Sequence, residues 1–244
     1  MYSKFVAKVL VGMCLISGAA LADTAKVDAA KAAIKSALKA KFAGIPVDSV
    51  RKMPYDGLYE FVSDNQVFYT DRHVSYILVG RLIDAKSHRD LTEERVRDLM
   101  QVKFDTLPLD AAIKLVKGNG KRKMAVFSDP DCPYCKRLEA ELDKIDDVTI
   151  YLFLYPVELL HAGSTQKAKS VWCAPDRAKA WSELMHKGTV PQGGATCDTP
   201  VEKIRALAAK LKINGTPTLV FADGQRVPGA IPAAQMEKLL GSAK

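Results

Sequence analysis

The sequence predicts two folded domains, an α+β domain over residues 23–85 and an α/β domain over residues 108–244, connected by a linker helix within residues 86–107. Three observations support this prediction. One amphipathic helical pattern is followed by short strand patterns in the first part. A charged helical pattern then ends before Pro108. From that point, strand and helix patterns alternate to the C-terminus, which is typical of an α/β domain.

Residues 1–22 have the pattern of a secretory signal, with lysines before an apolar stretch and an A-x-A motif that ends at Ala22. We expect cleavage near Ala22-Asp23. The apolar stretch is too short to span a bilayer. Lipidation at Cys14 is the alternative, but Met13 is a poor residue before a lipidated cysteine. The mature chain then keeps four cysteines.

The first domain begins with an amphipathic helix over residues 29–42 that ends near Gly44. Three strand-like runs follow, at residues 58–62, 66–70 and 76–83, the last interrupted by a glycine. A domain this small is marginal by itself. Dimerisation is one remedy, because it covers an exposed sheet edge.

The linker is predicted to be a helix over residues 91–103. Either Asp90 or Thr92 can serve as its N-cap, and apolar residues then recur at helical spacing. The Glu93-Glu94 pair reads as the start of this helix and not as a catalytic pair.

The second domain should open with two strands, at residues 112–116 and 124–127. Gly118-Asn119-Gly120 between them predicts a hairpin. The elements expected after these strands are a helix that begins near residue 133, a central strand at 148–155, a helical insertion within 160–210, a second hairpin made of 218–221 and 226–227, and a closing helix at 233–240.

The motif Cys132-Pro133-Tyr134-Cys135 lies where the strand at residues 124–127 gives way to a helix. Two thiols at this spacing can form and open a disulfide, and the partial positive charge of a helix N-terminus stabilises a thiolate. A thiolate attacks disulfides. Half of a zinc site is the alternative, but no second CxxC or paired histidine follows. The motif therefore indicates redox chemistry on cysteines.

The other two cysteines of the mature chain, Cys173 and Cys197, form a structural disulfide if Cys132 and Cys135 pair locally. Closing a loop of that size would contribute about 3 kcal/mol. The alternative is that both are free, buried thiols.

The formal net charge of the chain is +8, with the basic residues spread along it. Nucleic-acid binding would require a basic stripe with interleaved aromatic residues, which is missing. We expect no nucleic-acid partner, no metal and no cofactor. His161 reads as a loop or surface residue, and Trp172 and Trp181 as packing residues.

The order of strand, CxxC helix, strand, helical insertion, Thr216-Pro217, hairpin and helix resembles the thioredoxin fold. With the export signal, the small N-terminal domain and the linker helix, the whole mature chain resembles the DsbC/DsbG family of periplasmic thiol:disulfide interchange proteins. The extra cysteine pair favours DsbC, whereas the CPYC motif is more similar to DsbG. Cys173 and Cys197 match the extra structural pair of DsbC.

This resemblance implies an isomerase and reductase of wrong disulfides in misfolded exported proteins. It implies that Cys132 attacks, that Cys135 resolves, and that Pro217 follows a cis peptide bond and contacts substrate with Thr216. Pro133 and Tyr134 shape the loop between the thiols. The resemblance also implies a homodimer formed by residues 23–85, chaperone activity, and a membrane DsbD as reductant.

One position departs from the thioredoxin pattern. Thioredoxins have a buried Asp six residues before the first cysteine, and this chain has Val126. Three other functions use the same nucleophile or the same cleft: a DsbG-like reductase of sulfenic acids, a chaperone, and a DsbA-like oxidase. The separate N-terminal domain and the Thr before Pro217 argue against the oxidase.

Overall fold

A computed structural model describes residues 17–194 and 196–243, with side chains from Lys26 onward. The charged and apolar parts of the predicted signal, including Cys14, lie outside the described residues. Among the described residues, no helix has the length and apolar character needed to cross a membrane. The chain divides into two compact units, residues 1–99 and 100–244.

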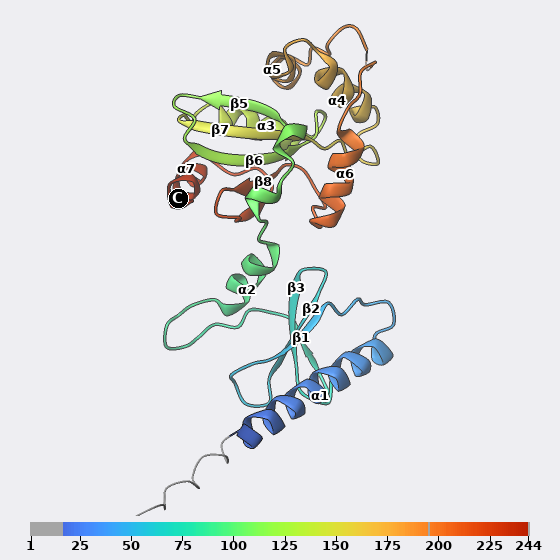
Figure 1. Ribbon diagram of the computed structural model, residues 1–244, viewed down its shortest axis with the longest axis vertical. Coiled ribbons are helices and arrows are strands. Elements are labelled where there is room, and N and C mark those ends of the chain that lie inside the picture. Colours follow the sequence, from blue (N-terminus) through green and yellow to red (C-terminus); the bar gives the residue numbers. More distant parts are fainter. Residues whose placement is uncertain (1–16, 195, 244) are drawn as a thin grey trace, which may run out of the picture. The chain divides into compact units, whose positions relative to one another are not determined.

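The first unit is one helix on a four-stranded antiparallel sheet of order β1-β2-β3-β4 (Figure 1). Helix α1 (Ser17–Lys41) buries Ile34 and Leu38 against apolar side chains of the sheet and its loops. The strands are β1 (Ser49–Lys52), β2 (Tyr59–Ser63), β3 (Gln66–Thr70) and β4 (Ile77–Leu78). The predicted α+β organisation is confirmed.

One strand prediction for this unit is corrected, and one strand was not predicted. Of residues 76–83, only Ile77 and Leu78 pair with β3, and the chain leaves the sheet after Leu78. β4 is thus a short edge strand, and Val79 beside it is 75% exposed. Strand β1 was missed because its sequence, Ser-Val-Arg-Lys, lacks an alternating apolar pattern.

Helix α2 (Leu91–Met100) packs on the sheet of the first unit through Val96 and Leu99. The Oδ1 atom of Asp90 accepts a hydrogen bond from the Glu93 amide at 2.8 Å, so Asp90 is the residue that caps the helix. Arg95 Nε lies 2.9 Å from the buried Glu60 carboxylate of β2. The helix is three residues shorter at its C-terminal end than the predicted 91–103, because the chain turns into the second unit there.

The second unit is a five-stranded mixed sheet of order β5-β7-β6-β8-β9 with helices on both faces (Figure 1). The strands are β5 (Ile113–Lys117), β6 (Arg122–Ser128), β7 (Val148–Leu154), β8 (Thr218–Phe221) and β9 (Arg226–Pro228). The helices are α3 (Pro133–Leu142), α4 (Ser164–Cys173), α5 (Arg177–Lys187), α6 (Val201–Lys210) and α7 (Ala233–Ser242). Two short 3₁₀ turns, Phe104–Thr106 and Leu109–Ala111, precede β5.

Alternation along β6 divides the core of this unit in two, because successive side chains of a strand point to opposite faces. Met124 and Val126 face α3, α4, α5 and α7. Ala125 and Phe127 face α6 and the segment that contains Val102 and Phe104. These four side chains of β6 are all fully buried, which makes β6 the central strand of the unit.

The predicted hairpin at Gly118-Asn119-Gly120 is wrong. β5 pairs antiparallel with β7, and β7 pairs parallel with β6, so β7 lies between the two strands that this turn connects. The turn crosses the start of β7, where the Asn119 amide donates to Asp147 Oδ1 at 2.9 Å and Thr149 Oγ1 donates to the Gly120 carbonyl at 2.7 Å. A local turn signal gives no information about which strand the chain pairs with next. The second predicted hairpin, β8–β9, is confirmed.

Candidate active site

The CxxC pair lies at the carboxyl end of β6, where the chain turns into α3 (Figure 1). Cys132 is the N-cap residue of α3, and Pro133 is its first residue. Pro is favoured there because the first helical amide has no partner within the helix. The Lys136 amide donates to the Cys132 carbonyl at 3.1 Å, which begins the hydrogen bonding of the helix.

The loop before β8 lies against Cys132. β8 pairs with β6 in a register that sets Thr218 opposite Phe127. This register places the cis Thr216–Pro217 peptide beside the CxxC motif. The Cys132 thiol donates to the Thr216 carbonyl oxygen at 3.3 Å. Thr216 is half-buried and Pro217 is buried. The structure therefore brings together two of the predicted site segments that are far apart in the sequence.

The two thiols have different surroundings. Both are free, with Cys132 3% exposed and Cys135 completely buried. Burial raises the pKa of the Cys135 thiol to about 12, although the nearby Ser128 side chain and the hydrogen bond from the Asp129 amide oppose the rise. That amide lies 3.4 Å from Cys135 Sγ. Cys135 is thus held as a thiol at neutral pH, which suits it to a step after the first attack.

Asp129 connects the CxxC loop to the loop that follows β7. Its carboxylate is fully buried and accepts from the Val157 amide at 2.6 Å and the Asp131 amide at 2.8 Å. His161 Nδ1 lies 3.0 Å from the same carboxylate. Sequence reasoning placed His161 in a loop or on the surface. Parallel pairing of β6 with β7 could have predicted this contact, because it places the loops that follow the two strands at one edge of the sheet.

Position 126 carries no acid, and Val126 is completely buried between β7 and β8. A buried carboxyl lies instead on the CxxC helix, at Glu139. Burial raises its pKa to about 7, and the hydrogen bond from Trp181 Nε1, at 2.8 Å, opposes that rise. Sequence reasoning missed Glu139 because a charged residue inside a helix usually faces solvent.

The residues between the two cysteines face solvent. Pro133 is exposed, and Tyr134 is 56% exposed with the Arg137 guanidinium 5.2 Å from its ring centre. Such a cation–π contact stabilises the exposed ring by about 0.5–1 kcal/mol. Pro133 and Tyr134 are therefore available to a molecule that approaches Cys132.

The other cysteine pair is separate from this site. Cys173, at the end of α4, is joined to Cys197 by a disulfide with a Cα–Cα distance of 5.6 Å. The disulfide connects α4 to the segment before α6, within the helical insertion. In the described part of the chain, no three His, Cys, Asp or Glu side chains gather as metal ligands do.

The matches to known protein families follow the division of the chain into two units. Residues 109–244 match the family model of thioredoxin-like domains, and residues 25–93 match that of the disulfide bond isomerase protein N-terminal domain. The chain is 46% identical over 208 residues to a probable thiol:disulfide interchange protein DsbC of Bordetella parapertussis, which covers 85% of this chain and 73% of that one. The chain belongs to the DsbC family of thiol:disulfide interchange proteins.

More distant DsbC relatives match over similar lengths. Thiol:disulfide interchange protein DsbC of Escherichia coli is 25% identical over 200 residues, covering 81% of this chain and 82% of that one. Among solved structures, the disulfide interchange protein from Neisseria gonorrhoeae is 51% identical with a TM-score of 0.54. That match covers 56% of this chain and 98% of the other. The predicted family, fold and enzyme class are confirmed.

Proposed function

We propose that this DsbC-family enzyme is a periplasmic disulfide isomerase and reductase in which Cys132 attacks wrong disulfides and Cys135 resolves the mixed disulfide when the substrate is reduced. One observation supports this assignment most directly. Cys132 lies at the N-cap of α3 against the Thr216 carbonyl, whereas Cys135 is completely buried and its pKa is raised to about 12. Two thiols with such different surroundings suit two successive roles.

In the first step, the thiolate of Cys132 attacks one sulfur of a substrate disulfide. A bond forms between Cys132 and that sulfur, the substrate S–S bond breaks, and the other substrate sulfur leaves as a thiolate that takes up a proton. Cys132 lies at the N-terminus of α3, and the partial positive charge of a helix N-terminus favours an anion. The product is a mixed disulfide between enzyme and substrate.

Two outcomes follow from the mixed disulfide. In isomerisation, a different substrate thiolate attacks the substrate sulfur that is bonded to Cys132. A new substrate disulfide forms, the mixed disulfide breaks, and Cys132 leaves as a thiolate. In reduction, Cys135 loses its proton and attacks Cys132 Sγ, which releases the substrate as a dithiol and leaves Cys132–Cys135 oxidised. The raised pKa of Cys135 disfavours its anion, which gives the substrate time to rearrange.

Four residues are proposed to hold the substrate. Thr216 and Pro217 lie beside Cys132, and a substrate backbone placed there runs past the attacking sulfur. The exposed Pro133 and Tyr134 form the other side of this approach.

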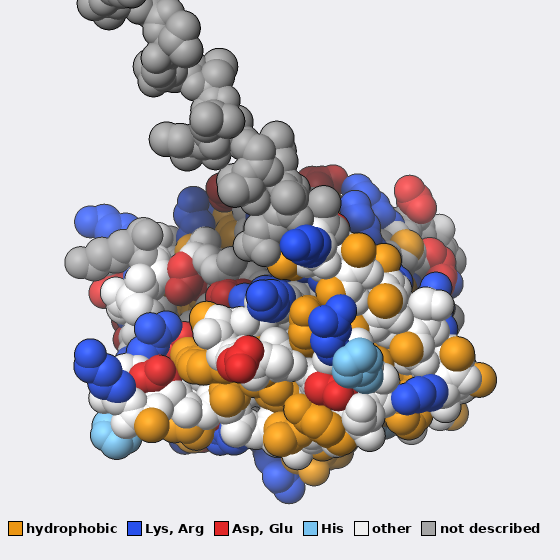
Figure 2. Space-filling model, turned by 90° about the horizontal axis from the view of Figure 1, so that it is seen from below, with side chains coloured by type: hydrophobic (Ala, Val, Ile, Leu, Met, Phe, Trp, Pro, Cys, Tyr) orange, Lys and Arg blue, Asp and Glu red, His pale blue; other side chains and the backbone are white. Residues whose placement is uncertain are grey.

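The proposed partners are misfolded exported proteins, a second copy of the chain, and a DsbD-type membrane reductant that returns two electrons to the oxidised pair. Export depends on the predicted signal, with cleavage near Ala22-Asp23. The first unit supports the dimer, since its edge strand β4 and the residue before it carry exposed apolar side chains, Leu78 at 47% and Tyr76 at 51%. The face in Figure 2 also carries apolar side chains between charged ones. Unpaired edges of this kind favour association.

Reactivation of a scrambled-disulfide protein in a glutathione buffer tests the proposed function. The mature chain should restore activity at catalytic concentration, and Cys132→Ser should lose this ability. Cys135→Ser should accumulate mixed disulfides with substrate. Full activity of Cys132→Ser contradicts the assignment. Rapid oxidation of a reduced substrate without reactivation would identify an oxidase instead.

A further inference from the structure

The loop after β7 is placed beside the CxxC motif by the sheet itself. β6 and β7 are parallel with Ser128 opposite Leu154, so both strands end at the same edge. The Tyr155 amide donates to the Ser128 carbonyl at 2.8 Å, which extends the pairing by one residue. The segment from Pro156 to His161, called here the leucine loop, therefore begins next to the residues that lead into Cys132.

The leucine loop is held in one shape by polar contacts at both ends. Its Val157 amide and His161 ring both bond to the buried Asp129 carboxylate. The Glu158 carboxylate accepts from the Gly163 amide at 2.7 Å and the Thr165 amide at 2.9 Å. The Thr165 side chain, and after it these two amides, lower the pKa of Glu158 to about 2. A loop fixed in this way loses little conformational freedom when it binds a partner.

This loop presents two leucines to solvent. Leu159 is 99% exposed and Leu160 is 71% exposed. Among the described residues of the second unit, the other large apolar side chains that are exposed are Tyr134 of the CxxC motif, Val116 and Val190. Three of these five side chains thus belong either to the CxxC motif, as Tyr134 does, or to the leucine loop, which is bonded to Asp129.

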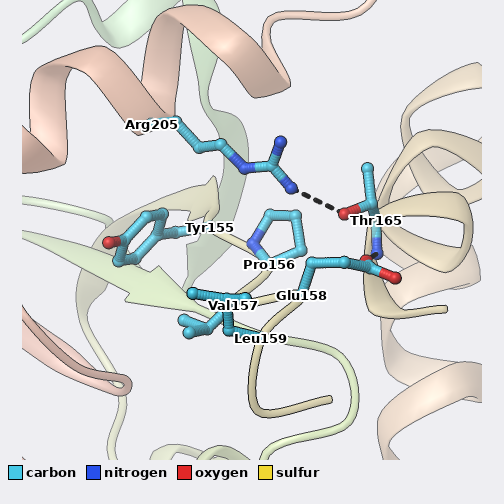
Figure 3. A pocket seen from close by; sticks show the side chains of 7 residues that line it. All are labelled: Tyr155, Pro156, Val157, Glu158, Leu159, Thr165 and Arg205. Carbon is cyan, nitrogen blue, oxygen red and sulfur yellow. Dashed lines mark hydrogen bonds between the residues drawn. The ribbon is translucent and has the colours of Figure 1, made fainter. Parts of the chain in front are cut away.

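Leu159 also borders a cavity of about 590 Å³, which Figure 3 shows from close by. Its apolar wall is formed by Tyr155, Pro156, Val157 and Leu159. The charged groups at its rim already have partners: Arg205 donates to Thr165 Oγ1 at 2.6 Å and to Glu202 at 2.9 Å, and Glu158 is bonded as described above. The cavity is therefore suited to an apolar, uncharged group.

We propose that the leucine loop and this cavity bind an apolar side chain of the substrate polypeptide, close in sequence to the cysteine that Cys132 attacks. This inference rests on the proposed function and names which part of the substrate the enzyme recognises. The occupant is an extended segment of a misfolded chain, because the loop is connected to the reaction site through Asp129. Each residue of an extended chain spans about 3.3–3.6 Å, so the residues next to the attacked cysteine reach beyond the thiols. Misfolded chains expose the apolar side chains that folded proteins bury.

The test follows attack by the reduced mature chain on three disulfides, each of which releases the coloured thionitrobenzoate ion. Two are peptides with a single cysteine joined to thionitrobenzoate, flanked either by leucines or by serines. The third is the small dithiobis(nitrobenzoate). The enzyme variant is Leu159→Ser with Leu160→Ser. The matched control is Val116→Thr, which makes an exposed apolar residue polar near the start of β7, at the opposite edge of the sheet.

The wild type and Val116→Thr should react about tenfold faster with the leucine peptide than with the serine peptide. The double variant should lose this preference and keep the wild-type rates with the serine peptide and the small disulfide. If the double variant still reacts faster with the leucine peptide, the docking site is overturned and the proposed function stands. Equal loss with all three disulfides also overturns it, because the loop would then act on Cys132 itself. No reaction of the wild type with any of them overturns the proposed function and this inference with it.

Discussion

At the scale of single residues, Glu139 shows how burial changes the chemistry of the helix that carries the CxxC pair. Its carboxyl is buried beside Trp181, and its pKa is raised to about 7 from an ordinary value of 4.5. A buried carboxylate without a cationic partner is costly, so the group holds its proton until the solution is near neutral. The folded state thus binds this proton more tightly than the unfolded state does.

This difference predicts how stability depends on pH. Between pH 4.5 and about 7 the unfolded chain releases the Glu139 proton first, so the free energy of unfolding falls as pH rises and levels off above about 7. Glu139→Gln keeps an acceptor for Trp181 and removes this loss. At about pH 8 it should be more stable than the wild type by up to roughly 3 kcal/mol.

Urea unfolding of both proteins at about pH 5 and about pH 8 measures this effect, and the quantity of interest is the difference between variant and wild type. A difference that stays constant between the two pH values contradicts the raised pKa. Glu183→Gln, at a half-buried position of α5, is the control for removing one carboxyl elsewhere in this unit.

At the scale of elements, the β8–β9 turn is fitted closely to the segment that enters the second unit. Gly224 has a φ of +88°, and a Cβ atom there would lie 2.6 Å from the Val102 carbonyl oxygen. The Val102 amide donates to the Gly224 carbonyl at 2.9 Å, so the two backbones are in direct contact. Gly229 has a similar φ of +85° but open space around its Cα.

This pair of glycines separates backbone strain from steric contact. Gly229→Ala should lower the free energy of unfolding by about 1 kcal/mol, the cost of a left-handed conformation. Gly224→Ala should lower it by about 3 kcal/mol, because it adds a clash with backbone that cannot move cheaply. Thermal or urea unfolding of the two variants checks this order. Equal losses of unfolding free energy in the two variants would show that the clash with the Val102 carbonyl adds nothing to the cost of the left-handed conformation.

The elements that could be predicted from the sequence are those with strong local patterns. The CxxC helix, the strand at 148–154 and the β8–β9 hairpin are of this kind. The neighbours of β5 could not be predicted, because pairing with β7 depends on residues that lie beyond the CxxC helix. Within the site, the motif residues were identifiable, whereas Asp129 and His161 meet only because two parallel strands end at one edge.

At the scale of the whole molecule, the two units have separate cores, and the boundary between them lies between Leu99 and Met100. Val102 and Phe104 are buried in the second unit, although they lie within the predicted linker. A truncated chain that starts near Leu107 therefore loses part of its core. One that starts at Met100 keeps these residues and is the better form of the second unit for experiments.

Sedimentation tests the proposed dimer with this boundary. The mature chain should sediment as a dimer at micromolar concentration, and the chain that starts at Met100 as a monomer. The shorter chain should still react with a small disulfide but should fail to reactivate a scrambled protein. A monomeric mature chain contradicts the dimer, and full reactivation by the shorter chain contradicts a role for the first unit in substrate binding.

The strand order of the second unit also bears on how the protein is made. β6 pairs with β8, so the chain downstream of the CxxC motif must be synthesised through Phe221 before the sheet around the motif is complete. Cys173 emerges before its partner Cys197. A nascent chain that meets an oxidant in that interval offers Cys173 only Cys132 and Cys135 as partners within the mature sequence. A wrong disulfide formed in that interval would be of the kind that the proposed reaction opens.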